Sequence, residues 1–207
     1  LEKQNKIFQN FRKTRNLTIA SYGFCLPNKG FLELVESINI LRNYDINLTL
    51  NIYSSIYNKD YYWVYKKIKN LIDNLDLGEL VNIHSEYIDE NKIADVLSNN
   101  DLIVFPYQSS NESSSAAVRD ALASLRPVLV TPLPIFDDVK NFVDYFPGFS
   151  AEQLAIGLKS WYERELEDPL NLFEFQQLRI NQLKYRRYSS LSHRISNIIQ
   201  SLELNNC

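Results

Sequence analysis

The chain has 207 residues, of which 45% are hydrophobic and 13% aromatic, and it carries a net charge of −3. This apolar content is enough to fill a core, which excludes a wholly disordered chain. The net negative charge indicates no basic surface for nucleic acid. The sequence has no run of about 18 apolar residues, so it predicts no transmembrane helix.

Along the chain, strand-like segments alternate with segments of helical spacing. In chain order the predicted elements are a strand (17–23), a helix (31–44), a strand (48–52), a helix (61–75), a strand (80–83), a helix (91–98), a strand (102–105), a short helix after Ser115, a strand (128–130) and a weak edge strand (142–145). This alternation predicts a parallel sheet with both faces covered. The expected fold is a doubly wound, Rossmann-like α/β domain.

The two ends of the chain do not follow this alternation of strands and helices. Residues 1–16 are polar and are expected to be the remnant of a linker, and the Rossmann-like domain is expected over 17–150. Residues 151–207 are predicted to be helical and to pack on the same domain. This tail comprises a helix over 151–167, a second helix that starts at Pro169 and a last amphipathic helix. The apolar face of that last helix is formed by Leu191, Ile195, Ile198, Ile199 and Leu202.

Cysteine and histidine are scarce. Cys25 and Cys207 cannot form a disulfide framework, and with only His84 and His193 besides them a zinc site is disfavoured. We therefore expect no metal and a cytoplasmic location. His84 follows a short predicted strand, where it is either a structural or surface residue or part of a pocket.

Two loops carry the residues that could bind a ligand or take part in catalysis. The first, residues 23–30 (GFCLPNKG), joins the first strand to the first helix, and its glycines permit a tight turn. Lys29 would lie beside a helix N-terminus, where the partial positive charge already favours an anion. A diphosphate suits such a site, although a surface lysine in an ordinary loop is the simpler alternative.

The second loop, residues 108–115, follows a buried strand and leads into the short helix. Its last three serines, Ser113, Ser114 and Ser115, are good N-cap residues, and only one of them is needed as a cap. A helix start of this kind supplies N–H and hydroxyl groups to phosphate oxygens. Asp120, within the helix, is suited to accept hydrogen bonds from ribose hydroxyls, or it is a solvated helix acid.

Together these loops resemble the C-terminal, donor-binding domain of GT-B glycosyltransferases of the retaining, glycogen-synthase-like group (glycosyl transferases group 1). The resemblance rests on Gly23 with Lys29–Gly30, on two acids separated by seven residues (Glu112 and Asp120), and on the preceding DLIVFPY, and it covers about residues 17–145. Two positions depart from the family pattern. Phe24 stands where an arginine is usual, and the second acid is Asp rather than Glu.

The resemblance implies a role for each matching residue. Lys29 and Glu112 would be catalytic, with Lys29 holding the donor diphosphate and Glu112 facing the donor sugar. Asp120 would hold the ribose. The implied substrate-binding residues are Gly23, Phe24, Ser114, Ser115, Ala116 and Asp120. Stabilising a departing nucleoside diphosphate in this way needs preorganised donors and no metal ion.

The implied function is transfer of a sugar, with retention, from a nucleoside-diphosphate-sugar to a glycan or glycoconjugate acceptor. This chain would be the donor-binding half of the enzyme, and a separate N-terminal domain would bind the acceptor. Two alternatives remain open: a sugar-nucleotide epimerase or phosphorylase of the same fold, and a non-catalytic domain that binds nucleotide sugars.

Residues 53–69 interleave six aromatic residues with four lysines. Such a segment predicts either a face that contacts a membrane surface or a partner, or a helix that packs its aromatic residues inward. The first reading would place the protein at the inner face of the membrane.

Overall fold

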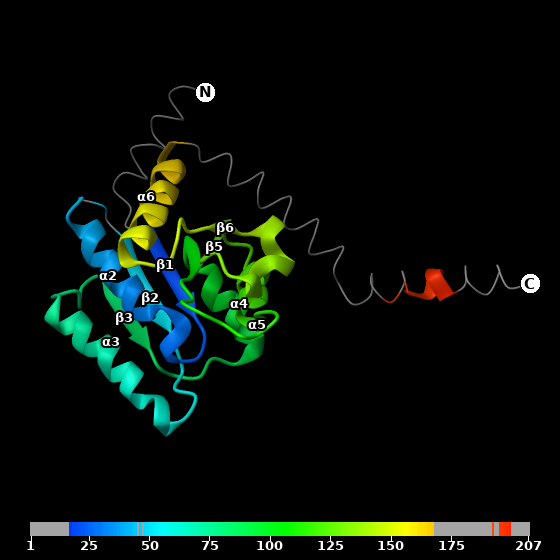
Figure 1. Ribbon diagram of the computed structural model, residues 1–207, viewed down its shortest axis with the longest axis horizontal. Helices are drawn as coiled ribbons and strands as arrows, with labels where there is room; N and C mark the ends of the chain where they lie inside the picture. Colours follow the sequence, from blue (N-terminus) through cyan, green and yellow to red (C-terminus); the bar gives the residue numbers. More distant parts are fainter. Residues whose placement is uncertain (1–16, 45, 47, 168–191, 193–194, 200–207) are drawn as a thin grey trace, which may run out of the picture. The chain divides into compact units, whose positions relative to one another are not determined.

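The fold is a six-stranded sheet covered by helices (Figure 1). A computed structural model describes residues 17–44, 46, 48–167, 192 and 195–199. The strands are β1 (Leu17–Tyr22), β2 (Leu48–Tyr53), β3 (Val81–His84), β4 (Leu102–Phe105), β5 (Val128–Val130) and β6 (Asp144–Tyr145). Every neighbouring pair is parallel, in the order β3-β2-β1-β4-β5-β6. This is the strand order of a doubly wound, Rossmann-like sheet, which confirms the predicted fold class.

Helices cover both faces of the sheet. The α-helices are α2 (Phe31–Arg42), α3 (Tyr62–Asn74), α4 (Glu90–Ser98), α5 (Ala116–Ala123) and α6 (Ala151–Glu167), and the 3₁₀ helices are η1 (Pro27–Lys29), η2 (Lys59–Tyr61) and η3 (Pro134–Phe142). One buried cluster joins the sheet to α2, α3 and α6, and a second joins it to α4, α5 and η3.

The strands contribute alternate side chains to these two clusters because successive residues of a strand point to opposite faces. Ile19 belongs to the first cluster and Ala20 to the second. In β4, Val104 packs toward the first cluster and Phe105 toward the second. All four residues of β4 are buried, which is why its sequence, LIVF, is a continuous apolar run rather than an alternating one.

The elements predicted between residues 17 and 167 all occur, with two differences between β5 and α6. No element was predicted between the strand at 128–130 and the edge strand at 142–145, but this stretch contains η3, which begins at Pro134 and buries Ile135, Phe136 and Val139. The weak edge strand near 142–145 is reduced to the two residues of β6. Proline is tolerated at the start of a helix because its missing N–H would have no partner there.

The C-terminal tail is described in part. The helix predicted over 151–167 is α6, which packs against α2. By contacts the chain divides into residues 1–169 and 170–207. In the second unit, Ser192 and residues 195–199 are helical, and Ile195, Ile198 and Ile199 are exposed. The linker over 1–16, the start at Pro169, and Leu191 and Leu202 lie outside the described residues.

None of the helices in the described ranges has both the length and the apolar composition of a membrane span.

Candidate functional site

A cleft of about 480 Å³ lies at the carboxyl ends of the strands. Its lining includes residues that follow β1 and β4. These two strands are neighbours in the sheet, and the order of the strands reverses between them. In open α/β sheets, this reversal point is where ligands bind. The volume lies within the range of small-molecule sites, which is about 300–1,000 Å³.

The two loops singled out in the sequence meet at this cleft. Seven of the eight residues assigned to the site line it, and they are Gly23, Phe24, Lys29, Glu112, Ser115, Ala116 and Asp120. Ser114 is not among the lining residues and is half-buried nearby. The order of the elements therefore brings together residues up to 97 positions apart, from Gly23 to Asp120.

Gly30 fixes how closely the two loops approach. Its φ of 73° is left-handed, and a Cβ at this position would lie 1.8 Å from the carbonyl oxygen of Pro106. Hydrogen bonds from residues next to this contact also join the loops. The N–H of Gln108 donates to the carbonyl oxygen of Asn28 (2.9 Å), and Asn28 Nδ2 donates to the carbonyl oxygen of Ser109 (2.9 Å). A glycine is therefore required here by both space and backbone conformation.

Lys29 ends η1, immediately before α2 begins. Its Nζ lies 3.8 Å from the centroid of the Tyr107 ring, and that tyrosine is buried. A cation over an aromatic face is attracted by the negative face of the ring. This contact directs the ammonium group of the first loop toward the strand end from which the second loop starts.

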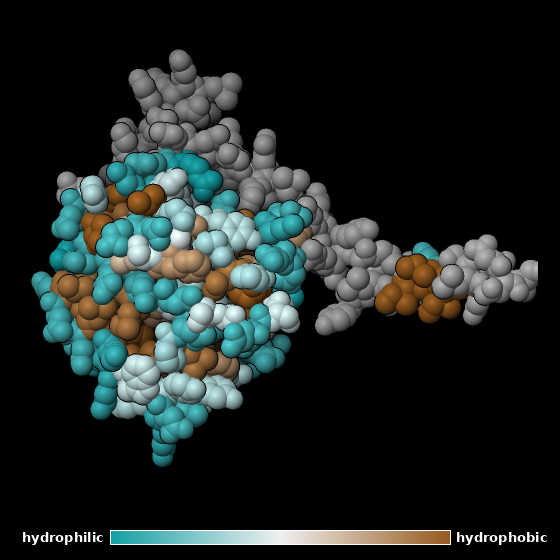
Figure 2. Space-filling model, in the orientation of Figure 1, coloured by the Kyte–Doolittle hydropathy of each residue, from teal (hydrophilic) through white to brown (hydrophobic). Residues whose placement is uncertain are grey.

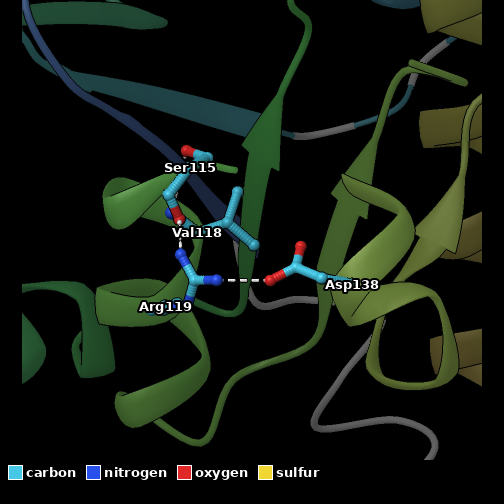
Figure 3. A network of polar contacts seen from close by, with 4 residues as sticks. All are labelled: Ser115, Val118, Arg119 and Asp138. Carbon is cyan, nitrogen blue, oxygen red and sulfur yellow. Dashed lines mark hydrogen bonds and ion pairs between the residues drawn. The ribbon is translucent and has the colours of Figure 1, made fainter. Parts of the chain in front are cut away.

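Ser115 is the residue that caps α5. Its backbone is extended and its Oγ accepts a hydrogen bond from the N–H of Val118 (3.4 Å). Figure 3 shows that Arg119 donates to the carbonyl oxygen of Ser115 and pairs with Asp138 of η3. The start of α5 is thereby tied to η3, and it also borders the cleft through Ser115, Ala116 and Ala117.

The cleft is rich in carboxylates. Among the described residues that line it, Lys29 is the single cation, whereas Glu86, Glu90, Glu112 and Asp120 are acids. Burial raises the pKa of the Asp120 carboxyl, and the nearby charge of Glu90 raises it further. Glu112, in contrast, is exposed at the cleft edge.

Tyr22 lies beside this acidic group. Burial, followed by the charge of Asp120, raises the pKa of Tyr22 to about 12. Its phenol therefore stays protonated through the neutral range and can both donate and accept a hydrogen bond. Tyr22 is the last residue of β1, directly before Gly23.

Phe24, at the position where the family pattern has arginine, forms part of the cleft wall. Its side chain is 44% exposed and its ring meets that of Tyr57 edge to face, with 5.1 Å between the centroids. An apolar side chain thus stands beside the expected phosphate site, and the cleft has one positive charge fewer than the family pattern implies.

Sequence reasoning missed most of the aromatic lining. The additional lining residues include Tyr22, Tyr53, Glu86, Tyr87, Glu90 and Tyr107. The signal that could have found several of them is their place at strand ends, since Tyr22 and Tyr53 close β1 and β2. His84 closes β3 and is exposed. Its ring stacks on that of Tyr53, with centroids 4.6 Å apart, although His84 is not among the lining residues itself.

No protein-family model and no curated protein matches this sequence. Solved structures do match the fold. A glycosyltransferase from Rickettsia africae has a TM-score of 0.67 at 20% identity, over 87% of this chain and 47% of that chain. Anabaena HepE, in complex with UDP and glucose, has a TM-score of 0.68 at 13% identity, over 95% of this chain and 52% of its own.

A third match is shorter. The C-terminal domain of a group 1 family glycosyl transferase (LpcC) from Francisella tularensis has a TM-score of 0.64 at 16% identity, over 88% of this chain and 92% of that domain. The chain thus spans about half the length of the Rickettsia and Anabaena proteins. Identities this low establish the fold alone: the chain has the fold of one half of a GT-B glycosyltransferase.

Proposed function

We propose that this chain is the C-terminal, donor-binding half of a retaining glycosyltransferase. It would bind a nucleoside-diphosphate-sugar and, together with an N-terminal acceptor domain, transfer the sugar to a glycan or glycoconjugate in the cytoplasm. The observation that carries the proposal is the meeting of two loops, distant in sequence, around one cleft of about 480 Å³. The ammonium group of Lys29, four carboxylates and the start of α5 converge there.

The proposed roles follow from the chemistry of each group. Lys29 would neutralise the diphosphate as it departs, and the free N–H groups at the start of α5 would donate hydrogen bonds to the same oxygens. Glu112 would face the donor sugar from the cleft edge. Asp120, half-buried and next to the neutral Tyr22 hydroxyl, would accept hydrogen bonds from the ribose.

One observation favours a second candidate, a non-catalytic domain that binds nucleotide sugars. Four acids and one lysine line the described part of the cleft, and Phe24 replaces a cation. With few positive charges, stabilisation of the leaving group would be weak, since transition-state stabilisation depends on preorganised charges and donors. Binding of a nucleotide would survive this loss better than rapid transfer would.

Calorimetry of the chain with UDP, GDP and ADP tests the proposal. One of the three nucleotides should bind, and Lys29→Ala should weaken it at least about tenfold, because a hydrogen bond to a charged group contributes about 1.5–3 kcal/mol. Asp120→Ala should weaken it as well. Exposed residues away from the cleft supply the matched controls, Lys140→Ala and Asp73→Ala, which should leave binding unchanged.

Unchanged binding in both cleft variants would overturn the assignment of the site. To separate the two candidate functions, the full-length protein is incubated with the donor that corresponds to the bound nucleotide. Release of the nucleoside diphosphate that depends on Lys29 supports the transferase. Tight binding without release supports the non-catalytic domain.

A further inference from the structure

The exposed side of α3 carries aromatic rings as well as charges. Tyr62 and Trp63 are each 45% exposed, although the same helix buries Val64, Ile68 and Ile72 against the sheet. Tyr57, just upstream, is 61% exposed. Tyr61 and Tyr65 are half-buried and pack at the edge of the core, as expected for a helix that packs its aromatic residues inward, whereas contact with a membrane surface or a partner stays a prediction.

Lysines lie directly against two of these exposed rings. Lys66 Nζ is 5.0 Å from the centroid of the Tyr62 ring, and Lys67 Nζ is 5.0 Å from that of Trp63. Each pair is spaced i, i+4, so both pairs lie on the solvent side of the helix. We use the name aromatic–lysine surface for the exposed residues Tyr57, Lys59, Tyr62, Trp63, Lys66, Lys67 and Lys69.

The charge of this surface is opposite to that of the whole chain. Residues 57–70 contain four lysines and a single acid, Asp60, whereas the chain as a whole has a net charge of −3. Figure 1 places the first turn of α3 at the lower edge of the domain. The surface there is white to teal rather than brown, as expected where tyrosine, tryptophan and lysine are exposed (Figure 2).

We propose that the aromatic–lysine surface binds the anionic surface of a lipid bilayer. Tyrosine and tryptophan favour the boundary between headgroups and acyl chains because one end of each ring system is apolar and the other polar. Lysines near an anionic leaflet each strengthen binding, roughly fivefold per residue. The surface combines both features on one exposed helix face.

The aromatic–lysine surface also adjoins the cleft. Tyr57 touches Phe24, and Phe24 lines the cleft. A membrane bound at this surface would bring lipid-linked molecules close to the cleft mouth. This consequence for the acceptor, a lipid-linked glycan, rests on the proposed function, whereas the binding of the bilayer does not.

Tryptophan fluorescence gives a direct measurement. The chain has two tryptophans, and Trp161 is 3% exposed, so a change caused by vesicles reports on Trp63. Vesicles of phosphatidylcholine mixed with phosphatidylglycerol should shift the emission to shorter wavelength, and brominated lipid should quench it. Trp63→Phe should abolish both signals. Pure phosphatidylcholine should bind weakly, and added salt should release the chain from the anionic vesicles.

Charge reversal tests the lysines. Lys66→Glu with Lys67→Glu should lower co-sedimentation with the anionic vesicles by about tenfold or more. The matched control reverses two exposed lysines elsewhere, Lys92→Glu with Lys140→Glu, and should keep most of the binding. Circular dichroism establishes that both double variants are folded.

The proposal is overturned if anionic vesicles leave the emission of Trp63 unchanged, or if both double variants lose binding equally. The result is independent of donor binding, because Trp63, Lys66 and Lys67 do not line the cleft. Nucleotide binding by calorimetry should therefore be unchanged in the variants of the aromatic–lysine surface. Vesicle binding without nucleotide binding would refute only the proposed function.

Discussion

Replacing Gly30 by alanine tests whether the close contact between the two loops builds the cleft. Gly30 joins η1 to α2 and lies against the backbone of Pro106, which follows β4 and leads into the second loop. An added Cβ would fall 1.8 Å from the Pro106 carbonyl oxygen. Because backbone rather than a flexible side chain occupies this space, the loops must move apart.

The magnitude follows from two contributions. The left-handed φ of 73° costs a residue with a Cβ about 1–2 kcal/mol. Separating the loops would break the two hydrogen bonds of Asn28, to Gln108 and Ser109, at about 1 kcal/mol each. The expected loss is therefore about 3–4 kcal/mol in the free energy of unfolding. For a domain of this size it corresponds to a fall of roughly 6–16 °C in Tm.

Urea denaturation followed by circular dichroism measures this loss, and calorimetry with the bound nucleotide measures the effect on the site. Gly78→Ala is the matched control, because nothing lies within 4 Å of a Cβ at Gly78. Its stability should stay within about 0.5 kcal/mol of the parent chain. A Gly30→Ala variant as stable as Gly78→Ala, with nucleotide binding intact, would refute the reasoning.

Three further predictions concern the cleft. Burial raises the pKa of Asp120, so folding disfavours its charged form. The resulting destabilisation is absent below the unfolded pKa of about 3.9, grows with pH between the unfolded and the folded pKa, and is complete above the folded pKa. Asp120→Asn should therefore be more stable than the parent chain at pH 7 but not at about pH 3, while losing nucleotide affinity; lower stability at pH 7 in urea denaturation would contradict this. Phe24→Arg should tighten nucleoside-diphosphate binding by about tenfold in calorimetry, since it adds a charge-assisted hydrogen bond, and an unchanged affinity would mean that the phosphates bind elsewhere. Sugar transfer by the full-length protein should persist in EDTA, and activity that returns only with added Mg²⁺ or Mn²⁺ would show that a metal is required.

Local patterning was enough to predict the elements and their order. The β-rich run of β1, the continuous apolar run of β4 and the helical spacing of α2 are local features, and each led to the correct element. The chain order of β-strands and helices then allowed few topologies, because parallel crossovers are almost always right-handed. The presence of Lys29 and Asp120 in one cleft was predictable for the same reason: both follow strands whose carboxyl ends share an edge of the sheet.

Other properties of the site depended on how distant segments pack. The sequence alone did not distinguish Ser114 from Ser115, because which serine caps α5 depends on the backbone conformation at the turn. Nor did it divide the aromatic residues of η2 and α3 into Tyr61 and Tyr65, which pack inward, and Tyr62 and Trp63, which face solvent.

By itself, then, the sequence determined the strands and α-helices of this protein up to residue 167, their order and the two loops that meet at the cleft. The tertiary structure alone decided that Glu86 and Glu90 join Asp120 around one cleft with a single lysine, and that Gly30 lies against Pro106. The physical reason is that secondary structure follows from neighbours in the chain, whereas the charge and shape of a cleft are set by side chains that only folding brings together.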